Sequence, residues 1–266
     1  MQAPQFEARD KRDEMNIRAD FHSHTKYSHG TGTVEDNVVA AMSLGLEALA
    51  ITDHGERHPL IGVKPSRFDE MRRDVDAVAK EYRFRVLLGI EANILSPRGE
   101  IDLSPEDAAK LDVVLAGFHL TAYPLRFKDY FKLPFNGVTR CFCRNSARQR
   151  ALNTEAFVRA VTEHEIDVLT HPGFRLDVEL KPIGEACAAA GTFVELSSRH
   201  KTPDLKGAEI LAATGAKLIV NSDAHKPARV GKCEYALDIV QKLGLDGDTV
   251  VNISDKPIVF RRGTTV

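Results

Sequence analysis

The chain has 266 residues, of which 43% are apolar, and its 36 basic and 38 acidic side chains nearly cancel. This composition is typical of a globular protein with a sizeable core, and the balanced charge argues against nucleic acid as a partner. No apolar run reaches the roughly 18 residues of a membrane span, and the first residues lack the apolar stretch of a signal peptide. With four cysteines in so long a chain, we expect a protein of the reducing cytoplasm.

Residues 1–16 are polar and irregular, and we predict a loose arm there followed by one domain over residues 17–266. In this domain, short apolar runs alternate with segments of helical periodicity. The predicted strands are Ile17–His22, Leu46–Thr52, Phe84–Ile90, Val113–Phe118, Ile166–Thr170, Thr192–Leu196 and Lys217–Val220. The tail is expected to add one short strand at Ile258–Phe260.

Helices are predicted between these strands. Thr33 is expected to cap the first, which Gly45 ends, and Ser104 to cap a short one that opens on Pro105. Either Asn153 or Thr154 is expected to cap a helix that runs through Val161. Further helical segments are predicted around Phe68–Val78, Ile183–Ala190, Pro203–Thr214 and Lys232–Leu243.

Strands and helices that alternate in this way predict a parallel sheet with right-handed crossovers. Seven such units without a linker favour closure into a barrel. An insertion at about residues 121–150, rich in prolines, aromatics and basic residues, breaks the rhythm.

Metal-binding residue types follow the predicted strands. His22 and His24 are two positions apart, so on a strand both project to the same face. Neutral imidazole is the commonest transition-metal ligand. At or just after the strand ends stand His22, His24, His29, His54, Glu91, His119, His171, Asp223 and His225. The C-terminal strand ends of a βα barrel meet at one rim, so this pattern predicts a polynuclear metal site there.

Six motifs resemble, in order, those of the PHP (polymerase and histidinol phosphatase) family. They are Asp20-x-His22-x-His24-Thr25, Ile51-Thr52-Asp53-His54-Gly55, Gly89-Ile90-Glu91-Ala92-Asn93, Gly117-Phe118-His119, His171-Pro172-Gly173 and Asn221-Ser222-Asp223-Ala224-His225. The resemblance runs from about Asp20 to Asp255 and implies a distorted (β/α)7 TIM-like barrel in a single domain. It also implies a metal-dependent hydrolase of phosphoric esters with three divalent metal ions.

The resemblance further implies how the ligands divide. One ion would be held by His22, His24, Glu91 and Asp223, a second by Glu91, His119 and His171, and a third by His29, His54 and His225. Zinc is the expected metal, with manganese or iron as alternatives for ligands of this kind. The implied reaction is hydrolysis of a small phosphate monoester by a metal-bridging hydroxide. Histidinol phosphatases and nuclease-like polymerase domains belong to the same family, so these activities stay open.

Other residues are assigned to catalysis or to the substrate. Asp53 is placed in the catalytic group with Glu91 and Asp223, because it precedes a ligand-type histidine that it could orient; a capping role is the alternative. Glu195 is expected to pair with an interior Lys or Arg. The candidate substrate-binding residues are Arg144, Arg148, His200, Lys226 and Arg229. The first two belong to the insertion, whose arginines would match phosphate oxygens unless the segment is only a solvated loop.

Two other functions fit parts of the pattern. βα barrels with strand-end histidines also cleave C–N bonds, but no lysine stands at a predicted strand end to serve an amidohydrolase as a carbamylated ligand. A metal-dependent binding module could use the basic insertion to contact nucleic acid, whereas the balanced charge and the full ligand set argue against it. The family resemblance therefore favours a phosphoesterase that acts on a small phosphorylated substrate.

Overall fold

The computed structural model describes residues 15–125 and 147–266, and in that part of the chain seven strands form one sheet in sequence order. The strands are β1 (Ala19–Asp20), β2 (Ala48–His54), β3 (Arg85–Asn93), β4 (Val113–Gly117), β5 (Val168–Leu169), β6 (Phe193–Ser197) and β7 (Leu218–Asn221). All neighbouring strands are parallel, as expected when long connections separate consecutive strands.

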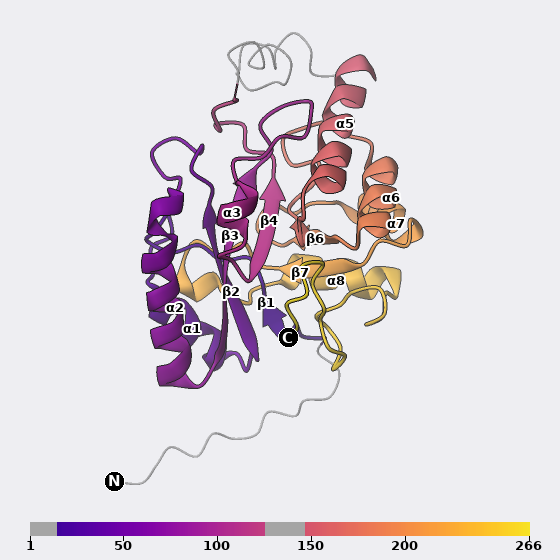
Figure 1. The fold of residues 1–266 in the computed structure, drawn as a ribbon. Coiled ribbons are helices and arrows are strands. Elements are labelled where there is room, and N and C mark those ends of the chain that lie inside the picture. Colours follow the sequence, from indigo (N-terminus) through magenta and orange to yellow (C-terminus); the bar gives the residue numbers. More distant parts are fainter. Residues whose placement is uncertain (1–14, 126–146) are drawn as a thin grey trace, which may run out of the picture.

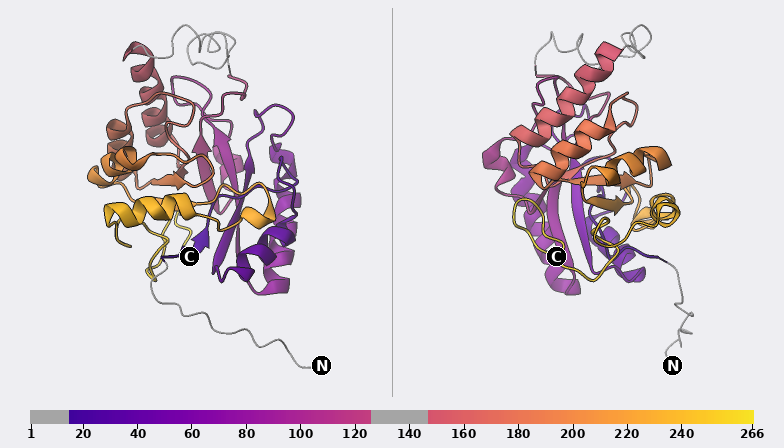
Figure 2. Two further views of the ribbon diagram at one scale, coloured as in Figure 1. Left: turned by 180° about the vertical axis from the view of Figure 1, so that it is seen from behind. Right: turned by 90° about the vertical axis from the view of Figure 1, so that its right-hand side faces the viewer.

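Helices cover the outer face of this sheet (Figures 1 and 2). They are α1 (Val34–Ser43), α2 (Phe68–Tyr82), α3 (Pro105–Ala108), α5 (Ala147–Glu163), α6 (Leu180–Ala190), α7 (Leu205–Ala213) and α8 (Glu234–Leu243), with 3-10 turns η1 (Pro65–Arg67) and η3 (Pro227–Arg229). In Figure 1, α1 and α2 lie along one flank and α5, α6 and α7 along the other, so the chain winds around the barrel in sequence order.

The sheet nearly closes between β1 and β7. The backbone N–H of His24 donates to the carbonyl of Ala224 at 2.8 Å, just beyond the two strands. Within the two strands, Nδ2 of the buried Asn252 side chain donates to the carbonyl oxygens of Ala19 in β1 and Val220 in β7, at 2.9 and 2.7 Å. These contacts join the first strand to the last, and they confirm the predicted distorted (β/α)7 TIM-like barrel in a single domain.

The barrel has an inner core at the N-terminal end of its strands. Successive side chains of a strand face opposite sides, so Ala48 and Ala50 point inward while Leu49 packs under the helices. Phe260, from the C-terminal tail, completes the inner core, where its ring meets that of Phe21 at 5.0 Å. The tail therefore fills the barrel at the end opposite the C-terminal rim of the strands, and Figure 1 shows the chain terminus there.

Most predicted elements lie where the sequence placed them. Thr33 caps α1 and Ser104 caps α3, as predicted. The tail at residues 258–260 pairs with residues 264–266 instead of adding a strand to the barrel. The predicted arm and most of the insertion lie outside the described residues. Among the helices that are described, none is both long and apolar enough to cross a membrane.

The predicted cap at Asn153 or Thr154 is wrong, because both residues lie inside α5. Their polar groups find partners within and beside the helix. Thr154 Oγ1 donates to the carbonyl of Arg150, and Asn153 Nδ2 donates to the carbonyl of Asp177, both at 2.8 Å. Residues that usually favour caps are thus accommodated in a helix interior, where tertiary partners satisfy them.

We expect Asp167 to make the stability of the fold depend on pH. This buried carboxylate accepts hydrogen bonds from the backbone of Val114 and of Arg262, at 2.8 and 2.9 Å. Burial raises its pKa to about 6 from 3.8, so the folded state takes up a proton that the unfolded chain binds only near pH 4. Asp167 should therefore favour folding more as the pH falls from 7 to 4, by up to roughly 3 kcal/mol.

Chemical denaturation of the wild type and of Asp167→Asn across this pH range would measure the effect. The amide does not titrate, so the unfolding free energy of the wild type should rise relative to that of the variant as the pH falls. A difference that stays constant from pH 7 to pH 4 would contradict the prediction.

Candidate metal centre

The predicted ligands lie at the C-terminal rim because the alternation that buries the core continues along each strand. Every second residue of a strand faces the same side, so His54 on β2 faces the same side as the inner-core residue Ala50. In the same way, Glu91 on β3 faces the same side as Leu87. A side chain that would extend the apolar core is replaced near each strand end by a metal-binding one. The parallel strands end on the same rim, so residues far apart in sequence meet there.

Four ligand atoms face one another in the first predicted group. The Nε2 atoms of His22 and His24 are 3.1 Å apart. Each lies between 3.3 and 3.8 Å from Glu91 Oε2 and from Asp223 Oδ1. Ligands of a tetrahedral zinc ion, at about 2.0–2.2 Å from the metal, are separated by roughly 3.3–3.6 Å. The spacing of these four atoms fits a single metal ion.

The second oxygen of Glu91 faces the second predicted group. Glu91 Oε1 lies 2.8 Å from Nε2 of His171 and 3.4 Å from Nε2 of His119. Thr170 Oγ1 also donates to this oxygen, at 2.9 Å. A Cβ atom at Gly117 would lie 2.2 Å from Thr170 Oγ1 and 3.3 Å from Glu91 Oε1, so no side chain fits there. The carboxylate thus presents one oxygen to each of two histidine groups.

The third predicted group lies beside the first. The ring of His29 is centred 4.0 Å from that of His225 and 4.9 Å from that of His54. His29 is the exposed member of this set. Among the described residues, four clusters have ligand atoms within 4.8 Å of one another, namely His24–His54–His225, His22–His24–Asp223, His54–Glu91–His119 and His171–His200–Asp223. All predicted ligands except His29 occur in these clusters.

Several atoms at the centre are buried without a hydrogen bond to any described residue. They include His24 Nδ1, His54 Nδ1, Glu91 Oε2 and Asp223 Oδ1. His54 Nδ1 is 2.9 Å from Glu91 Oε2, but the two atoms lack hydrogen-bond geometry. Buried polar atoms are costly unless they have a partner. Atoms that converge without bonding one another are what metal ligands require, so these residues fit bound cations.

The protonation states also suit metal binding. Burial alone would raise the pKa of Glu91, but the nearby His119 and His22 lower it well below its ordinary value. Burial lowers the pKa of His54 well below its ordinary range and that of His29 to about 4. At neutral pH these groups are therefore a carboxylate and neutral imidazoles, the forms that coordinate a metal. Surrounding carboxylates, Glu195 foremost, outweigh burial and raise the pKa of His22 well above its ordinary value, so a metal would displace a proton there.

Comparison with known proteins agrees with this geometry. The family model of the PHP domain matches residues 20–181. The chain belongs to the PHP domain family. A probable phosphatase of Shewanella sp. (strain ANA-3) is 30% identical over 257 residues, which cover 90% of this chain and 89% of the relative. A probable phosphatase of Thermoanaerobacter pseudethanolicus is 26% identical over 257 residues, covering 90% of this chain and 91% of the relative.

A solved structure has the same fold as this PHP domain. It is the histidinol phosphate phosphatase of Lactococcus lactis subsp. lactis, complexed with zinc, L-histidinol and phosphate. The match has a TM-score of 0.58 at 16% sequence identity and covers 86% of this chain and 95% of the Lactococcus chain. The family match and the curated relatives, probable phosphatases, identify the chain as a metal-dependent hydrolase of phosphoric esters.

The PHP domain holds its histidines through partners that the sequence did not reveal. Glu195, predicted to pair with a Lys or Arg, instead accepts a hydrogen bond from His22 Nδ1 at 2.7 Å. Asn93 Oδ1 lies 2.8 Å from His119 Nδ1. Each bond fixes a proton on Nδ1 and leaves Nε2 free to coordinate, as such partners of metal-binding histidines do. The prediction for Glu195 is corrected because its partner is His22, just beyond β1 and 173 residues away in the chain.

Asp53 directly precedes the predicted ligand His54 on β2, and its carboxylate bonds a loop. Its carboxylate accepts hydrogen bonds from the backbone and side chains of Thr25 and Ser28, including Thr25 Oγ1 at 2.6 Å. None of the hydrogen bonds that Asp53 makes within the described residues ends on an imidazole. These contacts anchor the segment between His24 and His29, so Asp53 acts on ligands through their backbone.

The candidate substrate-binding residues lie in different environments. Arg144 is outside the described residues, and Arg148 is exposed at the start of α5. Lys226 and Arg229 are exposed around η3. His200 lies at the metal centre itself, with Nε2 at 2.9 Å from Asp223 Oδ2.

A further cation, Arg199, was missed by the sequence reasoning. Its Nη1 lies 3.6 Å from Asp223 Oδ1 and donates to the carbonyl of Asp223 at 3.4 Å. Its side chain is 38% exposed, so it can reach both the centre and solvent. The sequence did indicate its position, because Arg199 directly precedes His200 and follows the end of a predicted strand.

Proposed function

We propose that this protein hydrolyses a small phosphate monoester at a centre of three divalent metal ions, with zinc the expected metal. The observation that carries the proposal is the position of Glu91, whose two oxygens face two separate groups of histidines. A carboxylate in this position can bridge two cations, which is the arrangement of two-metal phosphatases. The names of the curated relatives, probable phosphatases, support the same class of substrate.

The side chains of the centre would hold the ions, orient the ligands or anchor a loop. His22, His24 and Asp223 would hold the first ion with Glu91, and His119 and His171 would hold the second, while His29, His54 and His225 would hold the third. When bound, the ions supply an activated bridging hydroxide and positive charge for the phosphoryl oxygens. Glu195 and Asn93 orient ligand imidazoles, and Asp53 holds the loop that carries two of the ligands.

The charges of the ligands favour a dianionic substrate. Three divalent ions bring six positive charges, and Glu91 and Asp223 cancel two of them. A bridging hydroxide cancels one more, so roughly three remain for a phosphate dianion to offset. A neutral amide would leave this charge uncompensated, which places phosphate ester hydrolysis ahead of amidohydrolase chemistry.

Metal removal and replacement test the proposal. Protein stripped with a chelator should be inactive on phosphate monoesters, and titration with zinc or manganese should restore activity as about three ions bind. Elemental analysis gives the metal content, and a panel of monoesters, diesters and amides gives the reaction class. Uptake of one ion or fewer would contradict the trinuclear centre, and cleavage of diesters or amides alone would favour the nuclease-like or amidohydrolase alternative.

We expect Arg199 to contact the substrate phosphate. A charge-assisted hydrogen bond contributes roughly 1.5–3 kcal/mol, so Arg199→Gln should lower kcat/KM by about 10- to 100-fold while metal content stays at the wild-type level. Lys226→Gln and Arg229→Gln provide the comparison, because both residues are exposed cations of the same rim. If either of these variants loses more activity than Arg199→Gln, the phosphate contact belongs to η3 instead.

A further inference from the structure

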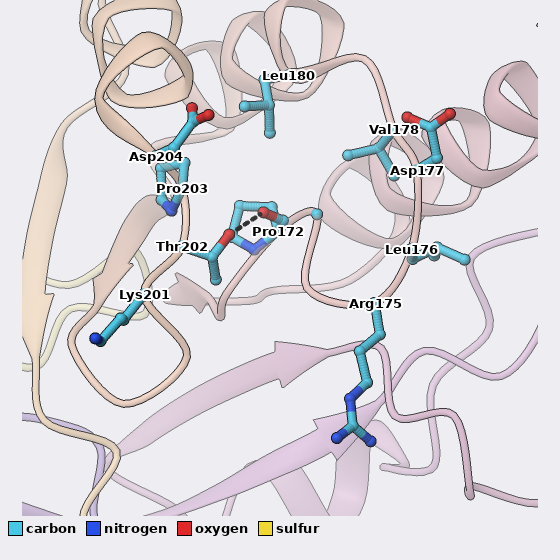
Figure 3. Close-up of a pocket in the computed structure, with 11 residues that line it drawn as sticks. Pro172, Arg175, Leu176, Asp177, Val178, Leu180, Lys201, Thr202, Pro203 and Asp204 are labelled. Carbon is cyan, nitrogen blue, oxygen red and sulfur yellow. Dashed lines mark hydrogen bonds between the residues drawn. The ribbon is translucent and has the colours of Figure 1, made fainter. Parts of the chain in front are cut away.

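A pocket of about 460 Å³ opens beside the candidate metal centre, between the loops that follow β5 and β6 (Figure 3). Pro172 directly follows His171, and Lys201 directly follows His200. The lining thus begins one residue beyond two histidines of the centre, and none of the predicted metal ligands belongs to it. The pocket is thus joined to the centre by two loops of the same rim.

Two cations lie on one edge of this pocket. Figure 3 shows Arg175 and Lys201 on the edge opposite Leu180 and Asp204. Neither cation forms an ion pair with any residue in the ranges 15–125 and 147–266, and both are exposed. Their positive charges are therefore available to a ligand.

The acidic residues of the pocket, in contrast, have partners. Asp177 pairs with Arg150 of α5 at 3.0 Å. Asp204 caps α7 and accepts a hydrogen bond from the backbone N–H of Gly207 at 2.8 Å. The carboxylates hold the two loops against the neighbouring helices, and neither of them pairs with Arg175 or Lys201.

Ring contacts fix Arg175 close to the metal centre. Its guanidinium lies over the Phe174 ring, 5.0 Å from the ring centroid, a favourable cation–π arrangement. The Phe174 ring stacks on that of His200 with centroids 3.7 Å apart, and His200 contacts Asp223. Arg175 is therefore linked to the predicted metal ligand Asp223 through Phe174 and His200.

Both cations also occupy a backbone conformation that suits glycine better. The φ angles are 55° at Arg175 and 52° at Lys201, in the left-handed region that a Cβ atom disfavours. Glycine can replace either residue without disturbing the path of the loop. Substitution by glycine therefore removes the charge and keeps the backbone, which separates binding from folding.

We propose that Arg175 and Lys201 form a subsite for a second anionic group, carried by the leaving alcohol of the substrate. The inference rests on the proposed function, because the scissile phosphate must sit at the metal centre for the alcohol to enter the pocket. Guanidinium forks pair well with carboxylates. The enzyme then prefers phosphate monoesters of hydroxy acids to esters of neutral alcohols.

Two esters that differ at one group test this preference. In 3-phosphoglycerate a carboxylate replaces the terminal hydroxymethyl group of glycerol 3-phosphate. For the metal-loaded wild type, kcat/KM should be at least about tenfold higher for 3-phosphoglycerate. In the double variant Arg175→Gly/Lys201→Gly the ratio should fall to about one, with Tm no lower than that of the wild type.

Arg83→Gly is the matched control. Arg83 is an exposed arginine with φ 49° at the C-terminal end of α2, before β3 and so at the opposite end of the barrel. This variant should keep the wild-type ratio. A wild-type ratio near one, or an unchanged ratio in the double variant, would overturn the subsite and leave the phosphatase proposal intact.

Calorimetry of the binding of the two esters tests the subsite independently of turnover. If neither of these esters nor any other monoester of the panel is hydrolysed with any metal, the proposed function fails. The subsite is still supported when 3-phosphoglycerate binds more tightly than glycerol 3-phosphate and the double variant loses the difference. Equal binding of the two esters to the wild type overturns it.

Discussion

Glu91→Gln should lower kcat by about 10³-fold or more and reduce the number of bound metal ions. Glu91 is 1% exposed, and its two oxygens face His22 and His171 at 3.3 and 2.8 Å. The amide has the same shape, but it is neutral, and its nitrogen cannot coordinate a cation. If Glu91 bridges two ions, the amide oxygen can serve only one of them, so the other ion loses a ligand. The centre also loses one of its two carboxylate charges, so the transition state loses electrostatic stabilisation.

The fold should survive this substitution, because the inner core at the other end of the barrel is untouched. Circular dichroism and Tm without metal test this point, and elemental analysis measures the ions that remain. Glu81→Gln, an exposed change on α2, is the matched control and should behave as the wild type. Turnover near the wild-type rate with full metal occupancy would show that Glu91 does not bridge.

The barrel and the position of its centre could be predicted because both depend on local patterns. Buried parallel strands appear in the sequence as short apolar runs, and the residue after each run lies at the rim. Thus Glu91 and His119 could be placed from the strands that precede them. The family resemblance added the grouping of ligands, which strand order alone does not give.

What the sequence could not show are contacts between distant segments. Glu195 and His22 are 173 residues apart, and only the closed barrel reveals that a carboxylate on β6 faces a histidine beyond β1. The cap expected at Asn153 failed for a related reason, since its amide is satisfied by the carbonyl of Asp177 rather than at a helix end. Arg199 was missed because no periodicity marks a rim loop whose side chain turns back towards Asp223.

Glu195→Gln should weaken metal binding by about 10- to 100-fold, the usual effect of losing a partner that orients a ligand. Glu195 is fully buried. Its Oε1 accepts hydrogen bonds from His22 Nδ1 at 2.7 Å and from Asn221 Nδ2 at 3.1 Å, and its Oε2 accepts one from the backbone N–H of His171 at 2.9 Å. The carboxylate thus accepts hydrogen bonds through both oxygens.

An amide can satisfy only one side of this arrangement. If its oxygen faces His22, its NH2 group opposes the N–H of His171 and displaces that ligand. If its NH2 group faces His22, the imidazole must accept a hydrogen bond at Nδ1, so the proton moves to Nε2, the nitrogen that would bind metal. Either orientation harms a predicted ligand, and activity at limiting metal should fall with metal affinity.

Saturating metal distinguishes a positioning role from a direct one. If Glu195 only orients ligands, excess zinc or manganese should restore kcat to within several-fold of the wild type. Nitrogen chemical shifts of His22 in the metal-free protein should also show the altered tautomer. Glu209→Gln, an exposed change on α7, should alter neither quantity. Unchanged metal affinity in Glu195→Gln would mean that the hydrogen bond to His22 does not hold the imidazole for a metal.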